Sequence, residues 1–390
     1  MTGPFQSYKI LDLSWGVAGP LVGMLFADYG AEVIKIEPPG GDPMRKMPAY
    51  AVWNRGKKSL TLNLKAEPGR EILHRLMRGA DVVIESWSAG TSERLGLDYA
   101  NLVSRYPRLI YCAISGYGHS ESGCEHPGYE ALVQAGSGLC HEQPGFRAGP
   151  NFMFFPVTSY GAAFLASIGI AAALFRRGTN GAGCRVETSM LGGALASLAL
   201  QMSWAENPTG NLATPSHSSA PGKGAPTADA YRCADGRYLY IHTGARGSFE
   251  RLCKLIGCNA ADFPGYYPAH FVGHPEQAAR FRPLVEKAFR SRPMLEWAAL
   301  LQREDIAVGP CLEPGEMLQH EQARANDLAL ELHDPQLGPL TQVGLPLKFD
   351  VSPGEVRGAA PTAGLDTAEI LASLGYSTDE VNGLRRSGVV

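Results

Sequence analysis

The sequence has no strong excess of charge of either sign. Its 390 residues include 35 Lys and Arg against 38 Asp and Glu, a formal net charge of −3 at pH 7. This balance excludes a broad basic surface, so we expect neither nucleic acid nor a membrane among its partners. An anionic ligand would need a local cluster of Lys and Arg.

Long apolar runs and metal motifs are also missing. The most apolar stretch, 162–175, is shorter than the roughly 20 residues that cross a bilayer, so it predicts a buried helix. His270 and His274 have helical i, i+4 spacing, but no H-E-x-x-H pattern accompanies them. We therefore predict no metal site.

Cysteine pairs of redox or zinc type are absent. The eight cysteines contain no C-x-x-C spacing, and Met1–Phe5 shows no basic region followed by an apolar run. The even count is compatible with disulfides, but in a chain of this length free thiols are the better interpretation. We expect a cytoplasmic protein.

Short apolar segments alternate with helical patterns through the first half. Strands are predicted at 8–13, 32–37, 59–64, 81–85, 109–114 and 185–189. Helices are predicted at 19–27, 69–77, 159–177 and 190–204. This alternation predicts an α/β fold with a parallel sheet covered by helices on both faces. Ligands of such sheets bind beyond the carboxyl ends of the strands.

The length of the chain predicts two domains. A stretch rich in Pro, Ser, Gly and Thr, 207–226, has the composition of a linker or mobile loop. Beyond it, 231–233 and 238–242 flank Ala-Asp-Gly and predict a hairpin that opens the second domain. An amphipathic helix is predicted at 367–374.

A series of motifs occurs in a fixed order along the chain. They read ILDLSWGVAGP (10–20), GAEVIKIEPPGGD (30–42), NRGKKSLTLNLK (54–65), ADVVIE (80–85), GTSERLG (90–96), ISGYG (114–118), GYE (128–130), LGYS (374–377) and GVV (388–390). Together they resemble family III CoA-transferases, the group of formyl-CoA and carnitine CoA-transferases. The resemblance covers nearly the whole chain and is weakest between 205 and 340.

The resemblance implies a Rossmann-like large domain with a parallel sheet plus a smaller α+β domain. The large domain would comprise 1–205 completed by the C-terminal tail 327–390, with a linker at 206–227 and the small domain at 228–326. It also implies an interlocked dimer, in which two chains thread through one another.

The resemblance also implies a binding site for coenzyme A. Its phosphates need Lys, Arg or helix N-termini, and its adenine needs a flat slot. The positions that match the family's CoA contacts are Val17, Ala18, Pro38, Leu62, Asn63, Leu64, Lys65, Ser86, Trp87, Ser88, Arg94, Pro127, Gly128 and Tyr129. Lys65 and Arg94 would bind phosphate and Trp87 would face the base. Pro38 replaces an arginine of some members. The alternative is that Lys65 and Arg94 are solvated surface residues.

Ser159 stands where the family has its nucleophilic aspartate. That aspartate lies ten residues before the glycine of a Leu-Gly-Ile segment, and here Gly169 of Ile-Gly-Ile places Ser159 there. A serine would form an oxygen ester, which is less activated than the family's anhydride and thioester intermediates. It would also need a base, for which Glu130 is the candidate. The alternative is that Ser159 only N-caps the next helix.

Three functions remain open from the sequence. The chain is the aspartate-lacking subunit of a heteromeric CoA-transferase acting on a CoA thioester and a small carboxylic acid, paired with a homologous aspartate-bearing subunit. Alternatively it is a homodimer with other acyl-CoA chemistry, such as hydrolysis, carbon–carbon cleavage, or isomerisation and racemisation involving His126. The third function is CoA binding without catalysis. A serine introduced in place of a native aspartate would give the same sequence.

Overall fold

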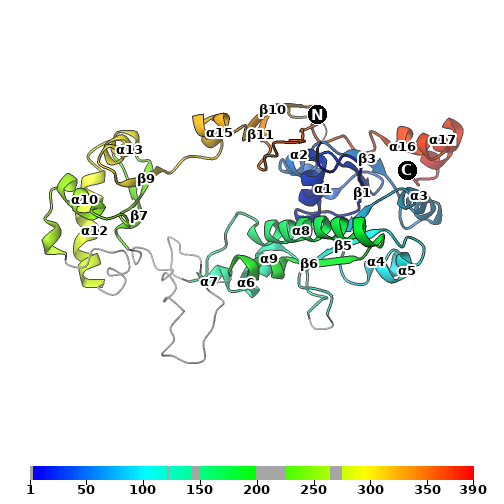
Figure 1. The fold of residues 1–390 in the computed structure, drawn as a ribbon, viewed down its shortest axis with the longest axis horizontal. Coiled ribbons are helices and arrows are strands. Elements are labelled where there is room, and N and C mark those ends of the chain that lie inside the picture. Colours follow the sequence, from blue (N-terminus) through cyan, green and yellow to red (C-terminus); the bar gives the residue numbers. More distant parts are fainter. Residues whose placement is uncertain (1–2, 121–122, 143–148, 199–224, 264–274) are drawn as a thin grey trace. The chain divides into compact units, whose positions relative to one another are not determined.

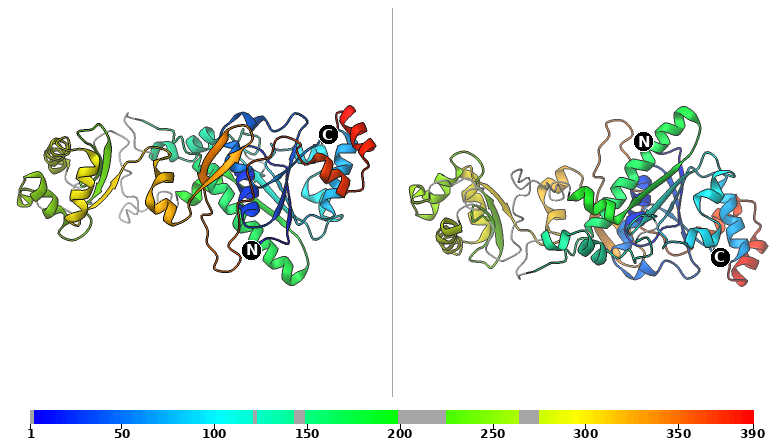
Figure 2. Two further views of the ribbon diagram at one scale, coloured as in Figure 1. Left: turned by 90° about the horizontal axis from the view of Figure 1, so that it is seen from above. Right: turned by 90° about the horizontal axis from the view of Figure 1, so that it is seen from below.

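The structure is a computed structural model that describes residues 3–120, 123–142, 149–198, 225–263 and 275–390. The chain divides into two compact units (Figure 1 and Figure 2). The large unit comprises 1–140, 152–204 and 318–390, and the small unit comprises 141–151 and 205–317.

The large unit is built on a six-stranded parallel sheet with the order β3-β2-β1-β4-β5-β6. Its strands are β1 (Lys9–Asp12), β2 (Glu32–Glu37), β3 (Lys58–Thr61), β4 (Val82–Glu85), β5 (Ile110–Ser115) and β6 (Arg185–Ser189). All neighbouring strands pair in parallel. The α/β fold with a parallel sheet is thus confirmed. The strand order reverses between β1 and β4, the position where doubly wound sheets bind ligands.

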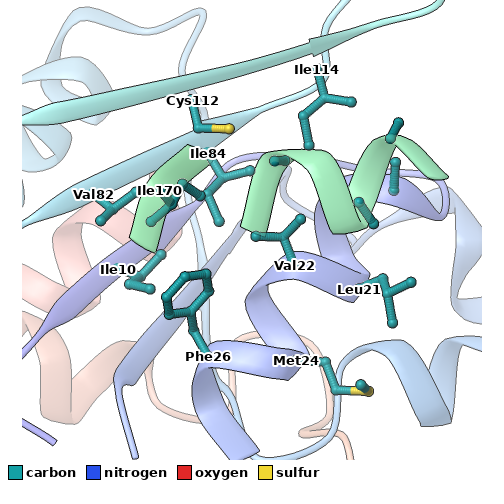
Figure 3. Close-up of a cluster of buried hydrophobic side chains, with 14 of the residues drawn as sticks. Ile10, Leu21, Val22, Met24, Phe26, Val82, Ile84, Cys112, Ile114 and Ile170 are labelled. Carbon is teal, nitrogen blue, oxygen red and sulfur yellow. The ribbon is translucent and has the colours of Figure 1, made fainter. Parts of the chain in front are cut away.

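Successive side chains of each strand point to opposite faces of the sheet, so the strands contribute to two separate hydrophobic cores, one on each face. Ile10, Val82 and Ile84 pack with α1 (Ala18–Asp28) and α8 (Val157–Asn180), as Figure 3 shows. Their strand neighbours pack on the other face with α3 (Glu67–Met77), α16 (Thr367–Ser373) and α17 (Thr378–Arg386); they include Leu11, Ile34 and Val83. Helices therefore cover both faces, as predicted.

Short helices connect these elements. They are α2 (Tyr50–Trp53), α4 (Thr91–Leu95), α5 (Tyr99–Val103), α6 (Glu130–Gly136), α7 (Leu139–Glu142) and α9 (Met190–Ser197), together with the 3-10 turn η1 (Pro43–Lys46). The helix predicted at 190–204 ends at Ser197, and residues 199–224 lie outside the described part.

The helix α8 is longer than the apolar stretch 162–175 at its centre. It has 24 residues and, among the described residues, is long and apolar enough to cross a membrane. One of its faces is buried, however, since Ala162, Ala166 and Ile170 belong to the core beside β5 and α1. This packing is that of a core helix of an α/β domain.

The C-terminal segment returns to the sheet of the large unit. It begins with the antiparallel hairpin β10 (Ala329–Asp334) and β11 (Gly338–Val343), which the sequence pattern did not predict. Farther on, Ser59 N donates to Asp366 Oδ2 at 2.7 Å, and Asn63 N donates to the Val389 carbonyl at 2.7 Å. The helix predicted at 367–374 is α16, whereas α17 was not predicted.

The small unit has its own antiparallel sheet, β7 (Ala228–Arg232), β8 (Tyr238–His242) and β9 (Ala307–Pro310). Its helices are α10 (Ser248–Ile256), η2 (Ala260–Asp262), α12 (Pro275–Phe289) and α13 (Met294–Arg303); α14 (Glu316–Gln319) and α15 (Glu321–Ala325) follow. Leu239, Phe249 and Phe281 lie in its core. The predicted hairpin is β7–β8. Most of the predicted linker, and both His270 and His274, lie outside the described residues.

Candidate functional site

The segments predicted to contact CoA follow the carboxyl ends of adjacent strands. Val17 and Ala18 follow β1, Pro38 follows β2, and 62–65 and 86–88 follow β3 and β4. Hydrogen bonds join neighbouring segments: Leu62 N donates to the Glu37 carbonyl at 2.7 Å. Because the strands are adjacent in the order β3-β2-β1-β4, these segments line one edge of the sheet.

The two predicted phosphate ligands are available at this edge. Lys65 and Arg94 are exposed, and the Arg94 guanidinium donates to Thr91 Oγ1 at 2.7 Å. Neither forms an ion pair with a carboxylate among the described residues. Trp87 is half-buried and packs against the hydrophobic core on the face of the sheet covered by α3, α16 and α17. This packing restricts the indole ring. These positions suit an anionic nucleotide, and their assignment remains a prediction.

Glu130 and Ser159 are brought together from two helices. Glu130 is the first residue of α6, and Ser159 lies in the first turn of α8. The Ser159 hydroxyl donates to Glu130 Oε2 at 2.6 Å, and Ser159 N donates to the same oxygen at 3.0 Å. Thr158 N and Gln134 Nε2 both donate to Glu130 Oε1 at 2.9 Å. The glutamate therefore caps the N-terminus of α8.

The interpretation of Ser159 as the N-cap of its helix is wrong. The helix begins at Val157, and its N-cap residue, Pro156, contributes no side-chain hydrogen bond. Ser159 is the third helical residue. The free amides of the first turn are bound by Glu130 instead, a carboxylate that also suits the positive end of the helix dipole.

This environment keeps Glu130 ionised. Burial raises the pKa of its carboxyl, but the hydrogen bonds from Gln134, Ser159 and Thr158 outweigh burial and hold that pKa below its usual value. A carboxylate with a lowered pKa is a weak general base near neutral pH. Ser159 is 4% exposed, and its hydroxyl faces a carboxylate that binds protons poorly.

The segment before Glu130 sits against the end of β5. Gly128 packs so closely on Gly116 that a Cβ at position 128 would lie 2.8 Å from the Gly116 Cα atom. Pro127, Gly128 and Tyr129 are exposed. The His126 ring lies edge-on to Tyr117, with the ring centroids 5.8 Å apart. Its proposed role in racemisation remains untested.

The sequence model of CoA-transferase family III matches residues 5–367. The chain belongs to this family. It is 28% identical to a cinnamoyl-CoA:phenyllactate CoA-transferase of Clostridium sporogenes, over 99% of this chain and 97% of that protein. It is 30% identical to a formyl-CoA:oxalate CoA-transferase of Streptomyces avermitilis, over the whole of both chains. The structure of a CaiB/BaiF family protein from Brucella suis is similar, with 27% identity, a TM-score of 0.83, and coverage of 96% of this chain and 100% of that one.

Sequence reasoning missed a second carboxylate of this family III member. Glu85 ends β4, directly before the predicted CoA contacts at 86–88, and is only 3% exposed. Burial raises the pKa of its carboxyl to about 7, while the hydrogen bond from Trp87 N acts in the opposite direction. A polar residue at the end of an apolar strand was the signal that could have singled it out.

Proposed function

We propose that this chain is the aspartate-lacking subunit of a heteromeric acyl-CoA:carboxylate CoA-transferase. The observation that carries the proposal is the first turn of α8, which holds Ser159 and no acidic residue. The substrate class follows from relatives whose names pair a CoA thioester with a carboxylic acid, as in cinnamoyl-CoA and phenyllactate or formyl-CoA and oxalate.

The transferase reaction depends on a carboxylate nucleophile. In the family, the aspartate attacks the thioester carbonyl, so that CoA leaves as thiolate and a mixed anhydride forms. The thiolate then attacks the aspartyl carbonyl, releases the donor acid and leaves an aspartyl thioester, and the acceptor acid completes the exchange in two mirrored steps. A serine ester lacks this activation. A homologous subunit with the aspartate would supply the missing nucleophile.

The geometry of Glu130 supports an inactive serine. Both oxygens of Glu130 accept hydrogen bonds from α8, and its pKa is lowered, so the carboxylate has little tendency to take the Ser159 proton. The two residues thus have the contacts of a structural cap.

Exposed apolar side chains support association with another chain. On α8, the large apolar residues Phe164, Ile168 and Phe175 are 51%, 67% and 83% exposed. Phe154, just before the helix, is 94% exposed. Apolar surface of this extent typically marks a protein–protein contact. A homodimer or a heteromer would cover it.

A second candidate is a homodimeric enzyme with different acyl-CoA chemistry, such as hydrolysis. It is favoured by the 2.6 Å hydrogen bond between Ser159 Oγ and Glu130 Oε2, the contact expected of a hydroxyl and its base. CoA binding without catalysis is the third candidate.

The test is exchange of a labelled carboxylic acid into its own CoA thioester, run with a panel of short-chain and aryl acids. We expect none with the purified chain and exchange after mixing with a homologous aspartate-bearing subunit. Exchange by the chain alone that is lost in Ser159→Ala would overturn the proposal. The matched control is Ser167→Ala, because Ser167 lies on the same helix and donates only to the Ala163 carbonyl.

A further inference from the structure

Four ionisable residues are buried together beneath the predicted CoA loops. Asp12, Lys35, Asp42 and Lys57, here called the buried quartet, are 0%, 1%, 5% and 6% exposed. Charged side chains are seldom this deeply buried unless they are paired. Two acids and two bases balance, and salt bridges join Lys57 to Asp12 at 2.8 Å and Lys35 to Asp42 at 3.4 Å.

The quartet holds both ends of the loop after β1. At the start of the loop, Ser14 N donates to Asp12 Oδ1 at 3.0 Å, and the Lys35 ammonium donates to the Ser14 carbonyl. At its end, Lys57 Nζ donates to the Pro20 carbonyl at 2.8 Å. The predicted CoA contacts Val17 and Ala18 lie between these two attachments.

The same charges reach the neighbouring loops. Asp42 closes the turn after β2 that contains Pro38, and it binds the ammonium of Lys35. The loop after β4 is connected to the quartet indirectly, through the loop after β1. Ser86 Oγ accepts from Trp15 N and donates to the Trp15 carbonyl, both at 3.0 Å. Three loops of the predicted site therefore depend on one set of buried charges.

The packing of α1 leaves room for the quartet. A Cβ at Gly23 would lie 2.9 Å from Asp12 Oδ2 and 3.0 Å from Lys57 Nζ. Lys57 uses all three of its ammonium hydrogens, because Asn54 Oδ1 accepts at 2.9 Å in addition to Asp12 and Pro20. Lys57 therefore has no spare donor.

We propose that the buried quartet positions the CoA-binding loops, so that Lys57 sets the affinity for CoA thioesters without touching them. This inference rests on the CoA-binding function proposed above. Lys57 is thus a positioning residue, and its contribution depends on its hydrogen-bond donors, because a side chain without them leaves the buried Asp12 carboxylate and the Pro20 carbonyl without this partner.

The charge on Lys57 is sensitive to pH. Burial lowers its pKa to about 8, and Asp12 and Asp42 oppose that shift while Lys35 adds to it. Beyond these groups, Asp28 also interacts with Lys57, but Asp28 is itself paired with Arg55 at 2.7 Å. A pKa lowered by burial means that the held arrangement binds the Lys57 proton less tightly than an arrangement with Lys57 in water, so the loops should be held more firmly as pH rises through about 8.

The experiment titrates the homomeric chain with acetyl-CoA, which has no free thiol to ionise, across a pH series. The wild-type affinity is expected to rise above about pH 8, because the held arrangement then no longer has to bury a charged ammonium. In Lys57→Met it should be about tenfold weaker at neutral pH and nearly independent of pH over this range. The matched control is Lys58→Met, because Lys58 is partly exposed, pairs with Glu32 and Glu369, and lies outside the quartet.

The outcomes separate the two proposals. No binding by the wild type at any pH would contradict CoA binding itself. Binding with the same affinity and pH profile in Lys57→Met as in the wild type would overturn the role of the quartet alone. If circular dichroism shows that Lys57→Met does not fold, Asp42→Asn gives the decision: weakened binding supports the proposal and unchanged binding rejects it.

Discussion

β2 and β4 both end in a buried glutamate, but the pKa values of the two carboxyls are shifted in opposite directions. Glu37 ends β2 and Glu85 ends β4, at 1% and 3% exposure. Arg45 lies 2.5 Å from Glu37 Oε1, and Ser59 Oγ donates to the same oxygen at 2.6 Å. Glu85 instead accepts from Trp87 N at 2.8 Å, and no cation pairs with it among the described residues.

The two carboxyls differ in pKa for this reason. Burial raises the pKa of Glu37, but Arg45, Ser59 and the Asp42 amide outweigh it and bring that pKa below its usual value. At Glu85, burial dominates and raises the pKa to about 7. Two strand ends of similar depth, on either side of β1, thus show that partners, more than burial, decide the charge of a carboxyl.

The largest expected effect comes from removing the cation beside Glu37, so that Glu37, like Glu85, is buried without a cationic partner. Arg45→Met leaves Glu37 buried without its cation and should lower the free energy of unfolding by roughly 3–5 kcal/mol at neutral pH. Urea unfolding followed by circular dichroism measures it. The control, Lys348→Met, removes an exposed pair with Asp327 and should cost less than about 1 kcal/mol. Equal losses in both variants would contradict this explanation.

The second effect appears as a pH dependence. The pKa of Glu85 is raised from 4.5 to about 7 on folding, so its stabilising contribution is complete below the unfolded value and is lost as pH rises through 7. The loss approaches roughly 3 kcal/mol. Glu85→Gln stays neutral and should gain stability over the wild type as pH rises from about 5 to about 8. Unfolding curves at both pH values measure this difference.

A suitable control for this variant is Glu71→Gln, an exposed glutamate of α3 that does not contribute to the pKa shift of Glu85. Its stability should follow the wild type at each pH. If Glu85→Gln also ran parallel to the wild type, Glu85 would be ionised when folded, and the contrast with Glu37 would disappear.

The smallest expected effect on stability comes from removing Ser59, the neutral hydrogen-bond partner of Glu37. Ser59→Ala removes one donor to Glu37 and the acceptor of Gly364 N, which lies 2.8 Å from Ser59 Oγ. We expect a loss of about 1–3 kcal/mol in unfolding free energy, below that of Arg45→Met, because the ion pair remains. Ser373→Ala, whose hydroxyl donates only to the Ile370 carbonyl, is the control. A greater loss for Ser59→Ala than for Arg45→Met would reverse the proposed ranking.

The fold was largely predictable because its strands and helices have strong local patterns. The predicted strands at 32–37 and 185–189 match β2 and β6 in full. The hairpin β10–β11 was missed because several of its positions alternate between exposed and half-buried, which leaves little apolar periodicity to detect.

For the candidate site, the sequence named Glu130 as the candidate base for Ser159 but gave no contact between them. The start of α8 was predicted two residues late because the capping carboxylate comes from another helix. No local pattern reveals a cap supplied at such a distance in sequence. Likewise, β2 and β4 both end in a glutamate. Only the tertiary structure shows that Arg45 forms an ion pair with Glu37 and not with Glu85.

The return of the C-terminal segment has a consequence for the nascent chain. The sheet of the large unit reaches one of its covers, α16 and α17, only after the small unit has left the ribosome. Until Asp366 and Val389 arrive at Ser59 and Asn63, the apolar face formed by Leu11, Ile34 and Val83 lacks these helices. Contacts so distant in sequence slow folding and favour aggregation of the unfinished chain. The unfinished chain should therefore expose more of that face than the complete chain does.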